Sequence, residues 1–168
     1  MKLRFQESEI RQWADKYHYP LEGEVLALKG PVLKAGCLNK RQLGLVALWK
    51  APRSAKHVDK NTNAYIKEVT AFAFQANDER ARIESLTILD GVAWPTASVI
   101  LHLFHRDPYP ILDFRALWSI GLPVPSQYEF SLWWPYVEYS RAVAARNDVD
   151  MRTLDRALWQ YSKERQKR

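Results

Sequence analysis

Two segments of the chain hold residue types that could do chemistry. The first has the sequence LDGVAWPTA at residues 89–97, which we call the hairpin segment. Gly91 can form a tight turn there, and Val92 can act as an apolar plug between the flanking helices. A turn that leads into a helix N-terminus presents unpaired backbone N–H groups, and such groups bind phosphate. Two interpretations of the hairpin segment stay open: a phosphate-binding turn, and an ordinary helical hairpin with a glycine cap.

The second segment ends in Asp113. It contains the sequence DPYP at residues 107–110, in which both prolines fix φ and disfavour helix in the residue before them. An aspartate between an extended stretch and a helix is a normal N-cap, so we expect Asp113 to cap a helix over residues 113–120. Two interpretations of Arg115 stay open: it contacts a phosphate, or it pairs with Glu84 or another acid.

Basic residues gather in the sequence WKAPRSAKH at residues 49–57. Lys50, Arg53, Lys56 and His57 surround a helix end that a proline stops. One interpretation is a cleft lining that meets phosphate or an extruded base. The other is a solvated basic loop, because cations near a helix C-terminus also complement its dipole. The sequence alone does not choose between them.

Metal chemistry has little support in the sequence. Cys37 is the only cysteine, which excludes an internal disulfide and four-thiolate zinc or iron–sulfur sites. His102 and His105 are three residues apart, within reach of one metal ion, and Asp107 is the best third ligand. That spacing is not convincing, so we expect surface or capping histidines and no metal site. A monovalent or divalent cation at the hairpin segment stays an open option.

These residues need elements to position them, and nearly every segment has helical rather than alternating spacing of apolar residues. The sequence therefore predicts an all-α protein. Gly30-Pro31 should convert part of the second expected helix into a turn, and Pro95 fits the first turn of the helix after the hairpin segment. The other helices are expected over residues 7–17, 24–33, 40–49, 61–75, 79–89, 113–120, 126–146 and 150–165.

The hairpin segment and the sequence YPILD at residues 109–113 together resemble the helix-hairpin-helix DNA glycosylase superfamily. LDGVAWPTA is similar to that superfamily's pattern hydrophobic-x-Gly-hydrophobic-Gly-x-x-Thr-Ala, and YPILD is similar to its proline-then-aspartate segment. One helix and a short loop separate the two motifs in the superfamily, as they do here. The sequence PILD at residues 110–113 is most similar to the corresponding segment of the adenine-mismatch glycosylases. The resemblance implies a divergent member with a helix-hairpin-helix glycosylase-like bundle.

This resemblance implies a function in base excision repair. The protein would bind double-stranded DNA, flip a damaged, mismatched or modified base out of the stack, and hydrolyse its N-glycosidic bond. Asp113 would be the catalytic residue, stabilising an oxocarbenium-like sugar and orienting or deprotonating water. The residues implied to bind DNA, with the two basic residues of the 49–57 stretch, are Gly91, Val92, Ala93, Trp94, Thr96, Arg115, Lys50 and Arg53.

The sequence departs from the family pattern at two positions. Ala93 stands where a second glycine is usual, and its Cβ narrows the approach to the backbone. Pro95 stands where bifunctional members carry the lysine that attacks the sugar, so Schiff-base lyase activity is not expected. Trp94 can touch the DNA backbone or minor groove, or pack inside the protein. The resemblance thus implies a monofunctional hydrolase without an iron–sulfur cluster.

The length of 168 residues suits one compact domain or two small lobes with a cleft. We expect one helical domain over residues 21–121, carrying the hairpin segment and the aspartate. Residues 1–20 plus 122–168 would form a second helical lobe, with the boundary marked by Gly121, Pro123 and Pro125. In the superfamily such terminal segments commonly pack together, with DNA held between lobes.

The net charge of +6 favours approach to a polyanion if the excess lies on one face. No run of about 18 apolar residues exists, and no apolar region follows the basic start, so no membrane span or secretory signal is predicted. We expect a cytoplasmic protein.

Two alternatives stay open. One is a non-catalytic helix-hairpin-helix module that binds DNA and uses Asp113 only as a cap, which Ala93 and Pro95 favour. The other is a helical protein-interaction protein whose aromatic C-terminal half forms an interface.

Overall fold

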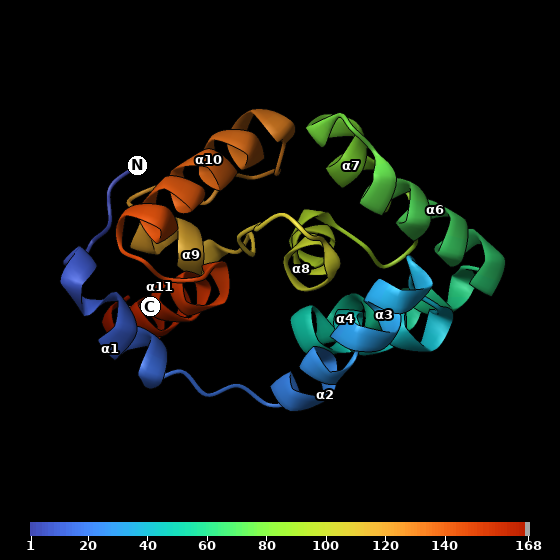
Figure 1. Cartoon of the computed structure of the whole chain (residues 1–168), viewed down its shortest axis with the longest axis horizontal. Helices are drawn as coiled ribbons and strands as arrows, with labels where there is room; N and C mark the ends of the chain where they lie inside the picture. The colour runs from blue at the N-terminus through green and yellow to red at the C-terminus, as the bar shows by residue number, and fades with distance from the viewer. Residues whose placement is uncertain (167–168) are drawn as a thin grey trace. The chain divides into compact units, whose positions relative to one another are not determined.

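The structure, a computed structural model, describes residues 1–166, and this part of the chain is helical without strands. The expected all-α class is confirmed for these residues. None of the described helices is long and apolar enough to cross a membrane. The helices (Figure 1) are η1 (Glu7–Glu9), α1 (Ile10–Asp15), α2 (Glu22–Ala27), α3 (Lys29–Ala35), α4 (Lys40–Lys50), α5 (Pro52–Ala55), η2 (Lys56–Lys60), α6 (Asn63–Gln75), α7 (Glu79–Leu86), α8 (Trp94–Phe104), α9 (Phe114–Ser119), α10 (Phe130–Arg146) and α11 (Met151–Arg165).

The chain divides into two compact units. Unit 2 is Tyr19–Arg106, and unit 1 combines Met1–His18 with the chain from Asp107 onward. Residues 1–18 thus belong to the same unit as the chain from residue 107 onward. The second boundary, however, lies after Arg106 rather than at residue 121. Residues 107–121 fold with the terminal segments, so Asp113 and the hairpin segment belong to different units.

Unit 2 is organised around α8. Nearly every side chain of this helix is buried, including Thr96, Ala97 and Ser98 in its first two turns. Both α4 and α7 pack against this helix, and Figure 1 labels the three elements. The helix that leaves the hairpin segment is therefore the central element of its unit, which fixes the direction of the turn that precedes it.

Unit 1 packs α1, α9 and α10 against α11. Its core includes Trp133 and Tyr136, which are fully buried, and Tyr109, which stacks on Trp133 with ring centroids 5.7 Å apart. The backbone of the N-terminal segment bonds to the end of α9, where the Lys2 N–H donates to the Ile120 carbonyl at 3.0 Å. The two fully buried aromatic side chains of α10 thus serve packing within the unit.

Several helix bounds differ from those expected, for local reasons. Leu28 separates α2 from α3, and Pro31 lies in the first turn of α3, where a proline loses no helical hydrogen bond. A second short helix therefore replaces the expected turn. The helix expected over residues 79–89 ends at Leu86, because the next residues enter the hairpin turn. The helix expected from residue 126 begins only at Phe130, after an extended Glu129.

Candidate functional site

The turn of the hairpin segment depends on Gly91. The Val92 N–H donates to the Leu89 carbonyl at 3.0 Å, which closes a four-residue turn with Gly91 in its third position. Gly91 has a φ of +82°, a left-handed value that other residues adopt at a cost. A Cβ added there would lie 2.9 Å from the Val58 backbone nitrogen and 3.1 Å from the Ser54 carbonyl oxygen. Both the conformation and the close packing therefore require glycine.

Asn61 fixes the same turn from the side. Its Nδ2 donates to the Asp90 carbonyl at 2.9 Å, and its Oδ1 accepts from the Asp90 N–H at 3.0 Å. Nδ2 also donates to the Val58 carbonyl at 3.0 Å, and only 4% of Asn61 is exposed. One buried amide thus ties the hairpin turn to the end of η2. Asn61 could not be found from the sequence, because a lone asparagine near a helix start gives no signal of a partner 29 residues along the chain.

The residues around the start of α8 divide into buried and accessible ones. Val92 and Thr96 are 4% and 1% exposed, so their side chains pack inside unit 2 and do not present themselves to a ligand. Trp94 is partly exposed, and Ala93 is exposed. Ala93 is the N-cap and supplies no side-chain cap. The first turn of α8 therefore lacks the capping side chain that usually covers its N–H groups.

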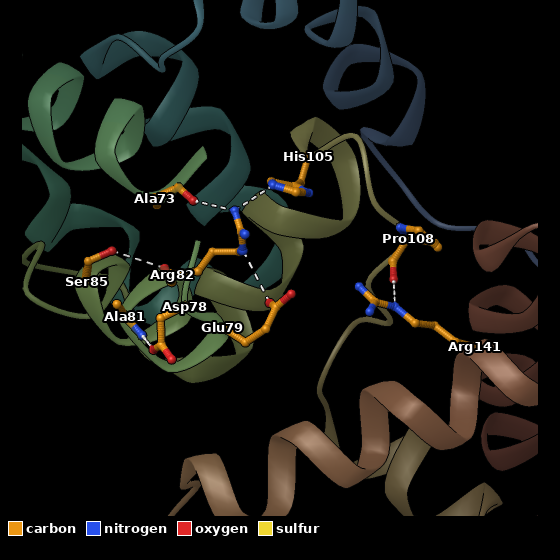
Figure 2. Close-up of polar contacts among 9 residues, drawn as sticks. All are labelled: Ala73, Asp78, Glu79, Ala81, Arg82, Ser85, His105, Pro108 and Arg141. Carbon is orange, nitrogen blue, oxygen red and sulfur yellow. Dashed lines mark hydrogen bonds and ion pairs between the residues drawn. The ribbon is translucent and has the colours of Figure 1, made fainter. Parts of the chain in front are cut away.

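The far ends of α7 and α8 are tied together by Arg82, which is 5% exposed (Figure 2). Its Nη1 donates to the Ala73 carbonyl at 3.1 Å and lies 2.7 Å from His105 Nε2. Arginine only donates, so that histidine nitrogen accepts and carries no proton. Nε of Arg82 donates to Glu79 at 3.2 Å. The guanidinium thus joins the ends of α6 and α8 to α7, a role that sequence reasoning also missed.

The basic stretch lies directly behind the hairpin turn. Pro52 begins α5 rather than only ending α4, and α5 leads into η2, where Val58 is buried beneath Gly91. Arg53 is exposed on α5, and Lys50 is partly exposed in the last turn of α4. Two of the candidate groups found separately in the sequence, the hairpin segment and the basic stretch, are therefore in contact.

Asp113 is the N-cap of α9, as the sequence predicted. One carboxylate oxygen accepts from the Ala116 N–H at 2.8 Å, and the side chain remains partly exposed. Two side chains of α10 hold the loop that leads to it. Tyr136 donates its hydroxyl hydrogen to the Ile111 carbonyl at 3.0 Å, and Arg141 Nε donates to the Pro108 carbonyl at 2.8 Å (Figure 2).

Burial and the charge of Asp113 raise the pKa values of two tyrosines. Burial raises the pKa of Tyr136 well above its ordinary value of 10.0, and the charges of Asp155 and Asp113 act in the same direction. Burial, and then the charge of Asp113, also raises the pKa of Tyr128. Both hydroxyls therefore keep their protons at neutral pH, and Tyr136 stays a hydrogen-bond donor to the loop.

The remaining candidates have the following contacts. Arg115 belongs to unit 1, as Asp113 does, and its guanidinium lies 5.2 Å from the ring centroid of Trp159. Glu84 pairs with Arg80 at 2.9 Å. Within residues 1–166 no group of three or more His, Cys, Asp or Glu is placed to hold a metal ion. His105, one of the two histidines considered as ligands, contacts Arg82.

Comparison of the chain with family models, curated proteins and solved structures finds no match in any of the three. The resemblance to the glycosylase superfamily therefore depends on the residues of the hairpin segment and of residues 109–113.

Proposed function

We propose that the protein binds the sugar-phosphate backbone of double-stranded DNA, with the hairpin segment holding a phosphate. The observation that carries this proposal is the turn at Gly91, which contacts within the protein hold in one conformation. A left-handed glycine packs against η2, Asn61 bonds both sides of Asp90, and the turn leads into a helix start without a capping side chain. Backbone N–H groups at such a helix start bind phosphate whatever the base sequence.

We further propose that Asp113 makes the protein a monofunctional DNA N-glycosylase. The oxygen of a water molecule bonds to C1′ of a flipped nucleotide, the C1′–N bond breaks, and the base leaves with a proton taken from solvent. The carboxylate accepts the proton that the water loses and stabilises positive charge on the sugar. Its support is the partly exposed carboxylate on a loop that Tyr136 and Arg141 hold. Pro95 provides no amine for lyase chemistry, so the product is an abasic site.

The non-catalytic DNA-binding module is the second candidate, and the departures from the family pattern at Ala93 and Pro95 favour it. The protein-interaction alternative has less support, since Trp133 and Tyr136 are fully buried and unavailable to a partner.

The test is release of free base from a panel of duplexes that carry deaminated, oxidised, alkylated and mismatched bases. Wild-type protein is compared with Asp113→Asn, which keeps a capping side chain but loses the carboxylate. Base release that disappears in the variant while DNA binding remains supports the glycosylase. Salt-sensitive binding without release on any duplex supports the non-catalytic module. Absence of both release and binding overturns the DNA proposal.

A further inference from the structure

We propose that residues 53–60, which we call the basic segment, form a second phosphate-binding element that is rigidly joined to the hairpin segment. The two elements would grip neighbouring phosphates of the same DNA duplex. This inference rests on the proposed function, since it assigns further binding residues and a footprint to the same site.

The joint between the two elements is tight. The backbone of Gly91 approaches Ser54 and Val58 so closely that a single Cβ would clash with the basic segment. Asn61, directly after the segment, bonds the hairpin turn through Asp90 and bonds the segment itself through the Val58 carbonyl. The hairpin turn and the basic segment therefore cannot shift independently, and a ligand held by one is presented to the other.

The charge of the basic segment suits a polyanion. Arg53, Lys56 and Lys60 are exposed, and Asp59 is the only acidic residue of the basic segment. Lys40 pairs with that acid: its Nζ lies 3.9 Å from a carboxylate oxygen of Asp59 and donates to the carbonyl of the same residue at 2.6 Å. The basic segment thus presents three exposed cations against one acid, and that acid has a cation of its own beside it.

The spacing of the cations also suits a DNA strand. Val58 is buried and anchors η2 at its middle, while Lys56 and Lys60 stand exposed at its two ends. A 3₁₀ helix rises about 2.0 Å per residue, so these ends lie about 8 Å apart along the axis. Successive phosphates of one strand are spaced about 3.4 Å along the duplex axis, so this distance spans roughly two of them.

A purely local role explains these cations less well. Basic residues stabilise the C-terminus of a helix by complementing its dipole, an effect confined to the last turn. The longer helix before them, α4, ends at Lys50, so Arg53, Lys56 and Lys60 lie beyond its last turn, while α5 has four residues and η2 has five.

The test is the salt dependence of binding to a fluorescent duplex of arbitrary sequence, measured by anisotropy. Each phosphate contact contributes about 0.9 to the slope of log K against log salt. The triple variant Arg53→Gln, Lys56→Gln, Lys60→Gln should reduce the magnitude of that slope by about 2.7. The control triple Lys29→Gln, Lys34→Gln, Lys67→Gln makes the same charge change at exposed positions of unit 2 and should leave the slope almost unchanged.

The outcomes separate the two proposals. A loss of slope in the first triple variant but not in the control, with the melting temperature of both kept, supports the basic segment. Equal slopes for the two triple variants overturn the basic segment and leave the hairpin proposal standing if wild-type protein binds. Absence of duplex binding by wild-type protein overturns both.

Discussion

The side chain of Asn61 bonds both backbone polar groups of Asp90, across 29 residues of sequence. A buried amide that pairs both backbone polar groups of one residue in this way helps to hold the turn in one conformation. Because the turn already has one conformation, less conformational entropy is lost when a ligand binds. This preorganisation of the turn is the feature on which the proposed DNA binding depends.

The close packing at Gly91 predicts an unusually costly alanine substitution. Gly91→Ala should destabilise unit 2 more than Gly36→Ala, although both glycines have a left-handed φ. A Cβ at Gly36 meets nothing within 4 Å, so only the left-handed cost of about 1–2 kcal/mol applies there. A Cβ at Gly91 also clashes with the Val58 backbone. Denaturant unfolding of both variants measures the difference, and equal losses would show that the turn yields easily.

The buried guanidinium of Arg82 should stabilise the protein far more than its exposed neighbour does. Arg82→Met leaves the Ala73 carbonyl and His105 without their partner, and we expect a loss of about 3 kcal/mol. Arg80→Met breaks only an exposed pair with Glu84, for which we expect less than about 1 kcal/mol. Thermal and urea unfolding compare the two variants. Similar losses would contradict the role of Arg82 in joining α6, α7 and α8.

Capping and catalysis by Asp113 can be separated by two substitutions. Asparagine caps helices about as well as aspartate, so Asp113→Asn should keep the stability of wild-type protein, whereas Asp113→Ala should lose about 1 kcal/mol. Both should abolish base release. An Asp113→Asn variant with undiminished base release would remove the carboxylate from the mechanism, while a destabilised Asp113→Asn would mean that the carboxylate has a further structural role. Unfolding and base-release measurements on the same preparations distinguish these results.

The stability of unit 1 should depend on pH through the protonation of Glu7. Hydrogen bonds from Arg146 and Asn147 lower the pKa of Glu7 from 4.5 to about 2. A lowered pKa stabilises the fold above the unfolded-state value, and this contribution is lost as the pH falls through the window from about 4.5 to about 2. Because the side chains are partly exposed, the effect should stay below about 1 kcal/mol.

We therefore expect Glu7→Gln to lower the melting temperature slightly at pH 7 and to match wild-type protein at the acid end of that window. Glu138→Gln, an exposed carboxylate of the same unit, serves as the control and should show no such difference. A Glu7→Gln effect that persists unchanged in acid would contradict the ion pair as its cause.

The parts of the fold that follow from neighbouring residues could be predicted from the sequence. Asp113 caps its helix, and Pro95 lies in the first turn of α8, because caps and prolines act within one helical turn. Asn61 and Arg82 could not be found in this way. Their partners lie 29 and 23 residues away, and only the packed structure brings them together.

The unit boundary was misplaced for a related reason. Gly121 with the prolines that follow it forms the strongest local break in the sequence, but the chain changes units earlier, after Arg106. Tyr136 and Arg141 bind the carbonyls of Ile111 and Pro108, which fastens that loop to α10. This attachment depends on residues that are distant in the sequence, and no change in amino-acid composition indicates it.

The most direct test of the account is the affinity of a fluorescent DNA duplex for wild-type protein and for Asn61→Ala, with Asn77→Ala as an exposed control. We expect salt-sensitive binding by wild-type protein and by Asn77→Ala. Asn61→Ala, measured at a temperature where it is folded, should bind the duplex at least tenfold more weakly, because its turn is no longer held in one conformation. A tenfold loss corresponds to about 1.4 kcal/mol of binding free energy. Wild-type protein that does not bind the duplex, or a folded Asn61→Ala that binds as tightly as wild-type protein, would contradict the central claim.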